Sequence, residues 1–77
     1  MRRPIEVSIP YDDVKLMIHP TRVESVSLSY FEPDGIYYLT IFFISGQMLN
    51  RKCAKDKQQA EAVYRQIVDI LECYREN

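Results

Sequence analysis

The nine-residue stretch Ile36–Ile44 constrains the fold more than any other part of the chain. It reads Ile-Tyr-Tyr-Leu-Thr-Ile-Phe-Phe-Ile, so β-branched and aromatic residues fill almost all of it. Turn-forming residues bracket it, with Pro33-Asp34-Gly35 before and Ser45-Gly46 after, a pattern typical of a β-strand. Apolar residues fall on both faces, which indicates a strand inside a sheet. We expect one face to cover the core and the other to be covered or to bind a partner.

The preceding residues, Val23–Phe31, show the most regular alternation in the chain. Serines alternate there with apolar residues, which predicts a second strand with one polar and one apolar face. The intervening Glu32–Gly35 favours a reversal, because proline suits the first central position of a type I turn and Gly35 can adopt a positive φ. We therefore expect the two strands to form a hairpin.

The register of this hairpin follows from the character of the opposed side chains. Placing Phe31 opposite Ile36 matches every pair, whereas a slip of one residue would set serines against the core. The other predicted pairs are Tyr30 with Tyr37, Leu28 with Leu39, Val26 with Ile41, Ser29 with Tyr38, Ser27 with Thr40, and Ser25 with Phe42. The predicted core face carries Tyr37, Leu39, Ile41 and Phe43. Beside the serine row, the predicted outer face carries Tyr38, Thr40, Phe42 and Ile44.

Two shorter segments near the N-terminus also alternate. Ile5–Ile9 ends at Pro10, which predicts a short edge strand. Val14–Ile18 alternates up to His19-Pro20 and is predicted to be another strand. A single helical turn starting at Asp12 or Asp13 is the alternative, because carboxylates suit a helix N-cap.

A more polar strand, Gln47–Cys53, is predicted after the Ser45-Gly46 turn. A two-residue loop would set Phe42 against Leu49, and a three-residue loop with Gly46 as the bulge would set Ile41 against Leu49. We favour the three-residue loop because it places Leu49 on the core side.

The segment from Asp56 to about Arg75 is predicted to be an amphipathic helix. Asp56 and Gln59 have the spacing of a capping box. One helical face collects the apolar residues Ala60, Val63, Tyr64, Ile67, Ile70, Leu71 and Tyr74. The predicted fold class is therefore α+β, an antiparallel β-meander of three to five strands with one C-terminal amphipathic helix packed on one face. Residues 1–77 leave room for a single small domain.

Charge and cysteine content narrow the classes of function. A net charge of −1 lacks the overall basic bias of a dedicated nucleic-acid binder. Charged residues or proline interrupt every apolar run, so no membrane span is expected, and the N-terminus lacks a signal-peptide pattern, so we expect the cytoplasm. Cys53 and Cys73 would lie about 30 Å apart along a helix, too far for a disulfide. With His19 the single histidine, no metal or cofactor is expected.

Two groups of residues are candidate binding sites. Tyr38, Thr40, Phe42 and Ile44 would form a protein interface unless the N-terminal strands fold over them. Arg51, Lys52, Lys55 and Lys57 cluster at the start of the helix, where positive charge opposes the helix dipole. An anion or nucleic acid would relieve that charge, although solvated lysines are the commoner explanation.

Catalytic residues are weakly indicated. His19 would need a substrate cleft and a second group to act as a general base. The serines of the alternating strand have no histidine at a motif spacing. Cys73 falls on the polar side of the helix and is expected to be an accessible thiol without a role. We therefore expect no enzyme activity.

The hairpin strand Ile36–Ile44, Gly46 and the helix Asp56–Leu71 resemble the closing third of pleckstrin-homology-like domains. The resemblance covers half of the chain and consists of hydrophobic spacing, and the chain is shorter than that fold's full strand count requires. It implies no binding residues.

The function predicted from the residues is a non-enzymatic protein-interaction module, an adaptor or inhibitor that occludes a partner surface, with another protein or a second copy as partner. Nucleic-acid binding through the basic residues is the alternative.

Overall fold

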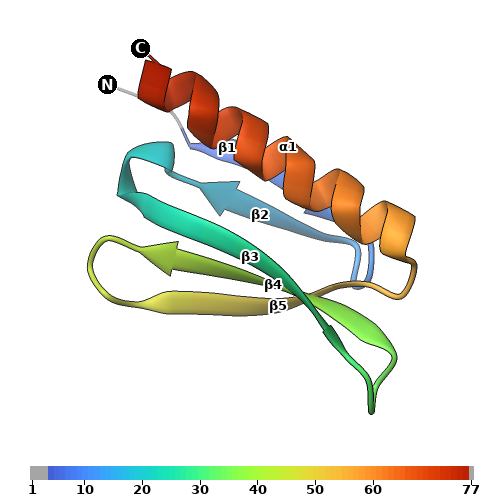
Figure 1. Ribbon diagram of the computed structural model, residues 1–77. Helices are drawn as coiled ribbons and strands as arrows, with labels where there is room; N and C mark the ends of the chain where they lie inside the picture. The colour runs from blue at the N-terminus through green and yellow to red at the C-terminus, as the bar shows by residue number, and fades with distance from the viewer. Residues whose placement is uncertain (1–3, 77) are drawn as a thin grey trace.

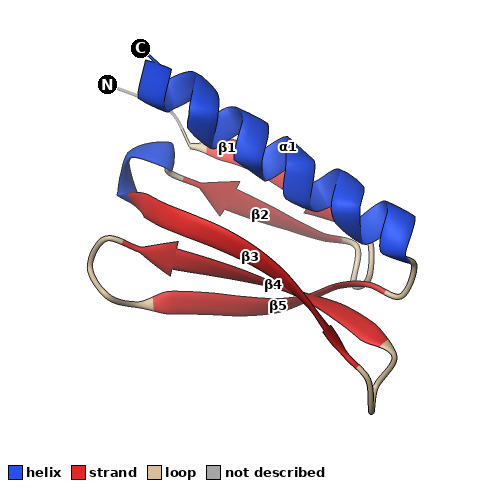
Figure 2. Cartoon of the chain, in the orientation of Figure 1, coloured by secondary structure: helices blue, strands red, loops and turns tan. Residues whose placement is uncertain are grey.

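The computed structural model describes residues 4–76, which form strands and one long helix (Figure 1). The elements are β1 (Ile5–Ile9), β2 (Val14–Ile18), the 3-10 turn η1 (Pro20–Arg22), β3 (Val23–Phe31), β4 (Ile36–Phe43), β5 (Met48–Ala54) and α1 (Lys57–Glu76). Figure 2 shows the long helix along one side of the strands. The predicted α+β class, with antiparallel strands and a C-terminal helix, is confirmed.

The strands divide into two antiparallel sheets. β3, β4 and β5 form a meander with β4 in the centre, as predicted, and β1 pairs with β2 in a separate hairpin. The prediction of a strand at Val14–Ile18 is confirmed, and the alternative helical turn is wrong. Asp13 takes a positive φ of 52° in the loop before β2, a conformation that aspartate tolerates better than most residues.

The predicted register of β3 on β4 is confirmed at every pair from Phe31–Ile36 to Ser25–Phe42. Beyond Ser25 the register shifts, because Val23 pairs with Phe43 and Glu24 is an extra residue in β3. Such a bulge changes which face the next side chain occupies. Val23 consequently turns to the core, where 5% of its surface is exposed.

The two turns of the meander also match the predictions. Gly35 has a φ of 64°, and its N–H donates to the carbonyl oxygen of Phe31 at 3.0 Å. Gly46 has a φ of 94° in the loop between β4 and β5. Ile41 pairs with Leu49, so the three-residue loop is confirmed. A side chain at either glycine would be strained at these positive φ angles.

The end of β5 contains a second bulge. Tyr38 pairs with Lys52 and Tyr37 with Ala54, which leaves Cys53 as the extra residue. Both Cys53 and Ala54 are buried, with 0% and 1% of their surfaces exposed. The bulge explains how two consecutive strand residues can both reach the core.

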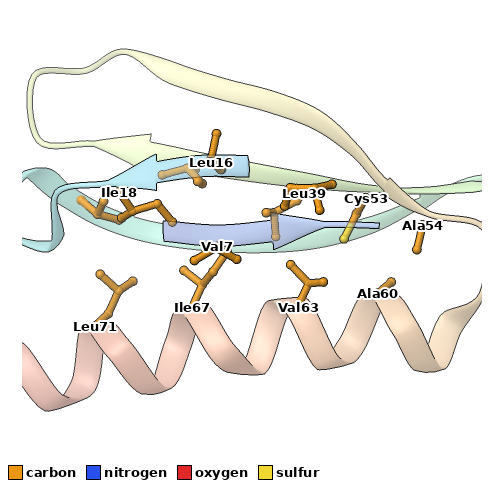
Figure 3. Close-up of a cluster of buried hydrophobic side chains, with 13 residues drawn as sticks. Val7, Leu16, Ile18, Leu39, Cys53, Ala54, Ala60, Val63, Ile67 and Leu71 are labelled. Carbon is orange, nitrogen blue, oxygen red and sulfur yellow. The ribbon is translucent and has the colours of Figure 1, made fainter. Parts of the chain in front are cut away.

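The helix begins after Asp56, as predicted. The Gln59 N–H donates to Asp56 Oδ2 at 3.1 Å, which satisfies one of the unpaired N–H groups of the first turn. The buried residues of α1 are Ala60, Val63, Ile67 and Leu71. Figure 3 shows these side chains pointing toward the strands.

The core lies between α1, the β1–β2 hairpin and one face of β4. Val7 of β1 points toward Ile67 of the helix (Figure 3), and both are fully buried. Leu39 and Ile41 of β4 belong to the same cluster. The helix and the N-terminal hairpin therefore pack on the same side of the central strand, the side predicted to be its core face.

Candidate functional site

The candidate site is the opposite face of the three-stranded sheet, called the outer face here. Strand alternation and the observed pairing place the Phe31–Ile36 pair on it and, beyond that pair, nine side chains in three cross-strand rows: Ser25–Phe42–Met48, Ser27–Thr40–Asn50 and Ser29–Tyr38–Lys52. The serines, Met48, Asn50 and Lys52 are exposed, and Tyr38 and Phe42 are half-buried by their neighbours. Lys52 carries the single charge among these nine residues.

Aromatic contacts order the end of the outer face nearest the β3–β4 turn. The rings of Phe31 and Tyr38 meet edge to face, with centroids 6.0 Å apart. The Tyr38 hydroxyl donates to Asp34 Oδ2 at 3.0 Å. Partial burial raises the pKa of Tyr38, and the hydrogen bond to Asp34 and the negative charge of that residue raise it further. The ring is therefore neutral and held in one orientation at neutral pH.

The four residues predicted for the protein interface differ in their location and in how exposed they are. Tyr38 and Phe42 lie on the outer face, as expected from their parity. Thr40 lies on it too but is only 8% exposed, because it sits between Ser27 and Asn50 in the middle of the sheet. Ile44 follows the end of β4 and is 66% exposed. It lies in the β4–β5 loop, where the strand alternation no longer applies.

Two exposed apolar residues of this face were absent from the predicted site. Phe31 is 49% exposed and Met48 is 62% exposed. Both could be found from the sequence by extending the predicted register outward, because Phe31 stands opposite Ile36 and Met48 opposite Phe42. They enlarge the apolar part of the outer face at its two ends.

Among the contacts described for residues 4–76, the N-terminal hairpin reaches the end of this face that carries Tyr38 and Lys52, and Tyr11 adds to burial in raising the pKa of Tyr38. The Tyr11 N–H donates to the Cys53 carbonyl oxygen at 3.1 Å. Lys52 Nζ lies 5.6 Å from the centroid of the Tyr11 ring, within the range of a cation–π contact. Phe42 stands between exposed Ser25 and Met48, and among the described residues it is outside the core cluster that the hairpin joins.

The predicted basic residues do not share one surface. All four side chains are exposed. Arg51 pairs with Leu39 on the core-facing side of β5, whereas Lys52 pairs with Tyr38 on the outer face. Lys55 lies before the helix, and Lys57 is its first residue. Nucleic-acid contact through these residues stays a prediction.

A pocket of about 550 Å³ lies where the end of β2, η1 and the β4–β5 loop meet. Its apolar lining comes from Met17, Phe43 and Ile44, and its polar lining from His19, Arg22, Ser45 and Gln47. The sequence did not indicate this cleft, because its walls come from segments more than twenty positions apart. His19 lines it, and among the described residues no carboxylate or thiol does.

The two thiols do not form a disulfide, as predicted. Cys53 is buried, and this burial raises the pKa of its thiol. Cys73 is exposed on α1. Within residues 4–76, no three His, Cys, Asp or Glu side chains are grouped closely enough to bind a metal ion.

Across the same described residues, α1 is too polar to cross a bilayer as a transmembrane helix.

Comparison with protein-family models, curated protein sequences and solved structures found no significant match to this chain.

Proposed function

We propose that this protein acts by binding a protein surface through the outer face, as an adaptor or inhibitor, rather than by catalysis. The observation that carries the proposal is the position of the helix and the hairpin on the same side of β4. Leu39 and Ile41 belong to the core cluster that these elements form, whereas Tyr38 and Phe42, on the other face of β4, do not. Aromatic residues that are already held by a rigid sheet lose little conformational entropy on binding.

The outer face favours a second copy of the chain as its partner. In its three cross-strand rows the β3 residues are all serines, whereas the larger side chains Tyr38, Phe42 and Met48 lie on β4 and β5. In the proposed dimer, the two-fold axis lies in the interface plane and runs parallel to β4. This axis places β3 of one copy over β5 of the other, so the serines of β3 contact Met48 and its β5 neighbours in the other copy. Such an isologous contact buries the same patch on both subunits.

Charge is compatible with this arrangement. Few charges lie at the centres of stable interfaces, and the nine residues of the outer face include only Lys52. The two-fold axis along β4 keeps the two Lys52 side chains at opposite edges of the interface. The aromatic residues Tyr38 and Phe42 then meet their counterparts near the axis. Packed sheets of this kind lie about 10 Å apart, with their side chains interdigitated.

The expected dimer is weak. A standard stable interface buries about 800 Å² per partner, and a single three-stranded face is smaller than that. We therefore expect a dissociation constant in the micromolar range, roughly 1 to 100 μM. Sedimentation velocity over protein concentrations from about 1 μM to about 1 mM would measure it.

The decisive variant is Ser27→Lys. Ser27 is exposed in the middle of the outer face, so the substitution adds a charge to the interface without disturbing the core. We expect it to weaken dimerisation at least about tenfold. Ser8→Lys is the matched control, because Ser8 is an exposed serine of β1 away from the outer face.

A second variant, Phe42→Asp, tests the centre of the interface and should give a monomer that retains its circular dichroism spectrum. The proposed self-association is refuted by a wild-type protein that stays monomeric throughout, or by a dimer that both variants leave intact. If the monomer instead binds a labelled oligonucleotide at low salt and loses it at higher salt, the nucleic-acid alternative replaces it.

A further inference from the structure

We propose that the pocket between β2, η1 and the β4–β5 loop binds a small carboxylate that carries an apolar tail. The pocket is separate from the nine residues of the outer face. Its volume of about 550 Å³ falls within the range of about 300–1,000 Å³ that is usual for small-molecule sites. The position also fits, because both sheets contribute to its lining, with Met17 from the two-stranded sheet and Phe43 from the three-stranded sheet.

The pocket is held in shape by the backbone. The Arg22 N–H donates to the His19 carbonyl oxygen at 2.9 Å, which closes η1. The Arg22 carbonyl oxygen in turn accepts from the Ile44 N–H at 3.0 Å. This second hydrogen bond joins one wall of the pocket to the other. A ligand would therefore meet a preformed site and lose less free energy in ordering it.

The apolar side chains that line the pocket would contact the tail of the ligand. Met17 is 53% exposed and Ile44 is 66% exposed, so two large apolar side chains face water at the pocket. Phe43 also lines the pocket, packs against the core and is half-buried. An apolar group in contact with all three would remove their surface from water. An aromatic tail suits the thioether of Met17 in particular.

Arg22 would bind the carboxylate of the ligand. Among the described residues 4–76, it is the permanently charged side chain of the lining. Within residues 4–76, the ion pair between Lys15 and Glu6 lies on the N-terminal hairpin and does not involve Arg22. A guanidinium offers two parallel N–H donors that match a carboxylate. Ser45 and Gln47 add neutral polar groups beside it. In the part of the chain that the structure describes, no aspartate or glutamate lines the pocket to compete with the ligand or repel it.

Titration with 3-phenylpropionate, followed by amide chemical shifts, tests the site. We expect saturable shifts at Arg22, Ile44, Ser45 and Gln47. The neutral analogue 3-phenyl-1-propanol keeps the tail and lacks the carboxylate. It should bind about tenfold more weakly, because a charge-assisted pair of hydrogen bonds is lost.

Variants separate the two parts of the ligand. Arg22→Gln should bind the acid and the alcohol equally, and Arg22→Lys should restore part of the difference. Ile44→Ser should weaken both ligands. Arg51→Gln is the matched control, because Arg51 is an exposed arginine of β5 outside this pocket, and it should bind as the wild type does.

Three results would overturn the assignment. The first is the absence of saturable shifts at the pocket, and the second is equal binding of the acid and the alcohol by the wild-type protein. The third is binding of a peptide through its C-terminal carboxylate when 3-phenylpropionate does not bind. Repeating the titration on Ser27→Lys keeps this test independent of self-association, because that variant leaves the pocket unaltered.

Discussion

The two faces of β4 differ in environment although both are rich in apolar and aromatic residues. On one face, Leu39 and Ile41 are 1% and 2% exposed. On the other, Tyr38 and Phe42 remain half-buried beside a row of exposed serines. The difference arises because α1 and the β1–β2 hairpin cover the same face. A strand that is apolar on both faces therefore shows that two surfaces need covering, without showing which elements cover them.

The largest expected effect is on the covered face. Leu39→Ala should lower the free energy of unfolding by about 2–5 kcal/mol, because it leaves a cavity in the core. Phe42→Ala on the outer face should cost only about 1 kcal/mol, since the ring is already partly in water. Urea denaturation of dilute protein measures both. Equal losses would show that Phe42 is covered within one chain, and the contrast between the faces would be wrong.

A smaller effect on stability is expected at the N-terminus of α1, the helix that covers the core face. Asp56→Ala removes the hydrogen bond to the Gln59 N–H and should destabilise the protein by about 1 kcal/mol, within a range of about 0.5–2. Glu61→Gln is the control, because Glu61 is exposed within the helix and has no capping role. An unchanged denaturation midpoint for Asp56→Ala would mean that packing alone positions the helix.

Alkaline pH should act on both faces in the same direction. Burial raises the pKa of Cys53 above 9.0 on the core side, and partial burial and Asp34 raise the pKa of Tyr38 above 10.0 on the outer face. Both groups hold their protons more tightly in the folded state. Their stabilising contributions are therefore complete below the unfolded pKa values and are lost as pH rises through the folded ones.

Unfolding free energies measured from about pH 8 to about pH 11 check this expectation. Cys53→Ala should flatten the decline at its lower end, and Tyr38→Phe should flatten it at its upper end. A decline that neither variant changes would assign the alkaline effect to other groups, such as the lysines.

The smallest effect is expected on the N-terminal hairpin. Lys15 Nζ and Glu6 Oε2 are 3.8 Å apart on side chains that are 68% and 53% exposed. Because water and salt screen such a pair, Glu6→Gln should change stability by less than about 0.5 kcal/mol. Val7→Ala on the buried face of the same strand provides the contrast, with an expected loss several times larger. A loss above about 1 kcal/mol for Glu6→Gln would show that the pair is more shielded than its exposure indicates.

Local features were predictable because each depends on neighbouring residues. The alternation of serines with Val26 and Leu28 defined both the faces and the register of β3 on β4. Gly35 and Gly46 marked the two turns, and Asp56 marked the start of the helix. The outer face was predicted through Tyr38 and Phe42 by the same alternation. Ile44 follows the end of β4 at Phe43, so its place on that face stays a prediction.

By itself, the sequence determined the strand and helix segments, the hairpin register and the two-sided character of Ile36–Ile44, since periodicity and turn residues encode these features over short distances. The tertiary structure alone decided that both covering elements lie on one face, that the strands divide into two sheets, and that bulges at Glu24 and Cys53 redirect side chains. It also brought Met17, Arg22 and Ile44 together in one pocket. These features depend on how segments distant in sequence pack against each other, and the side-chain pattern of one segment does not specify which neighbour will cover it.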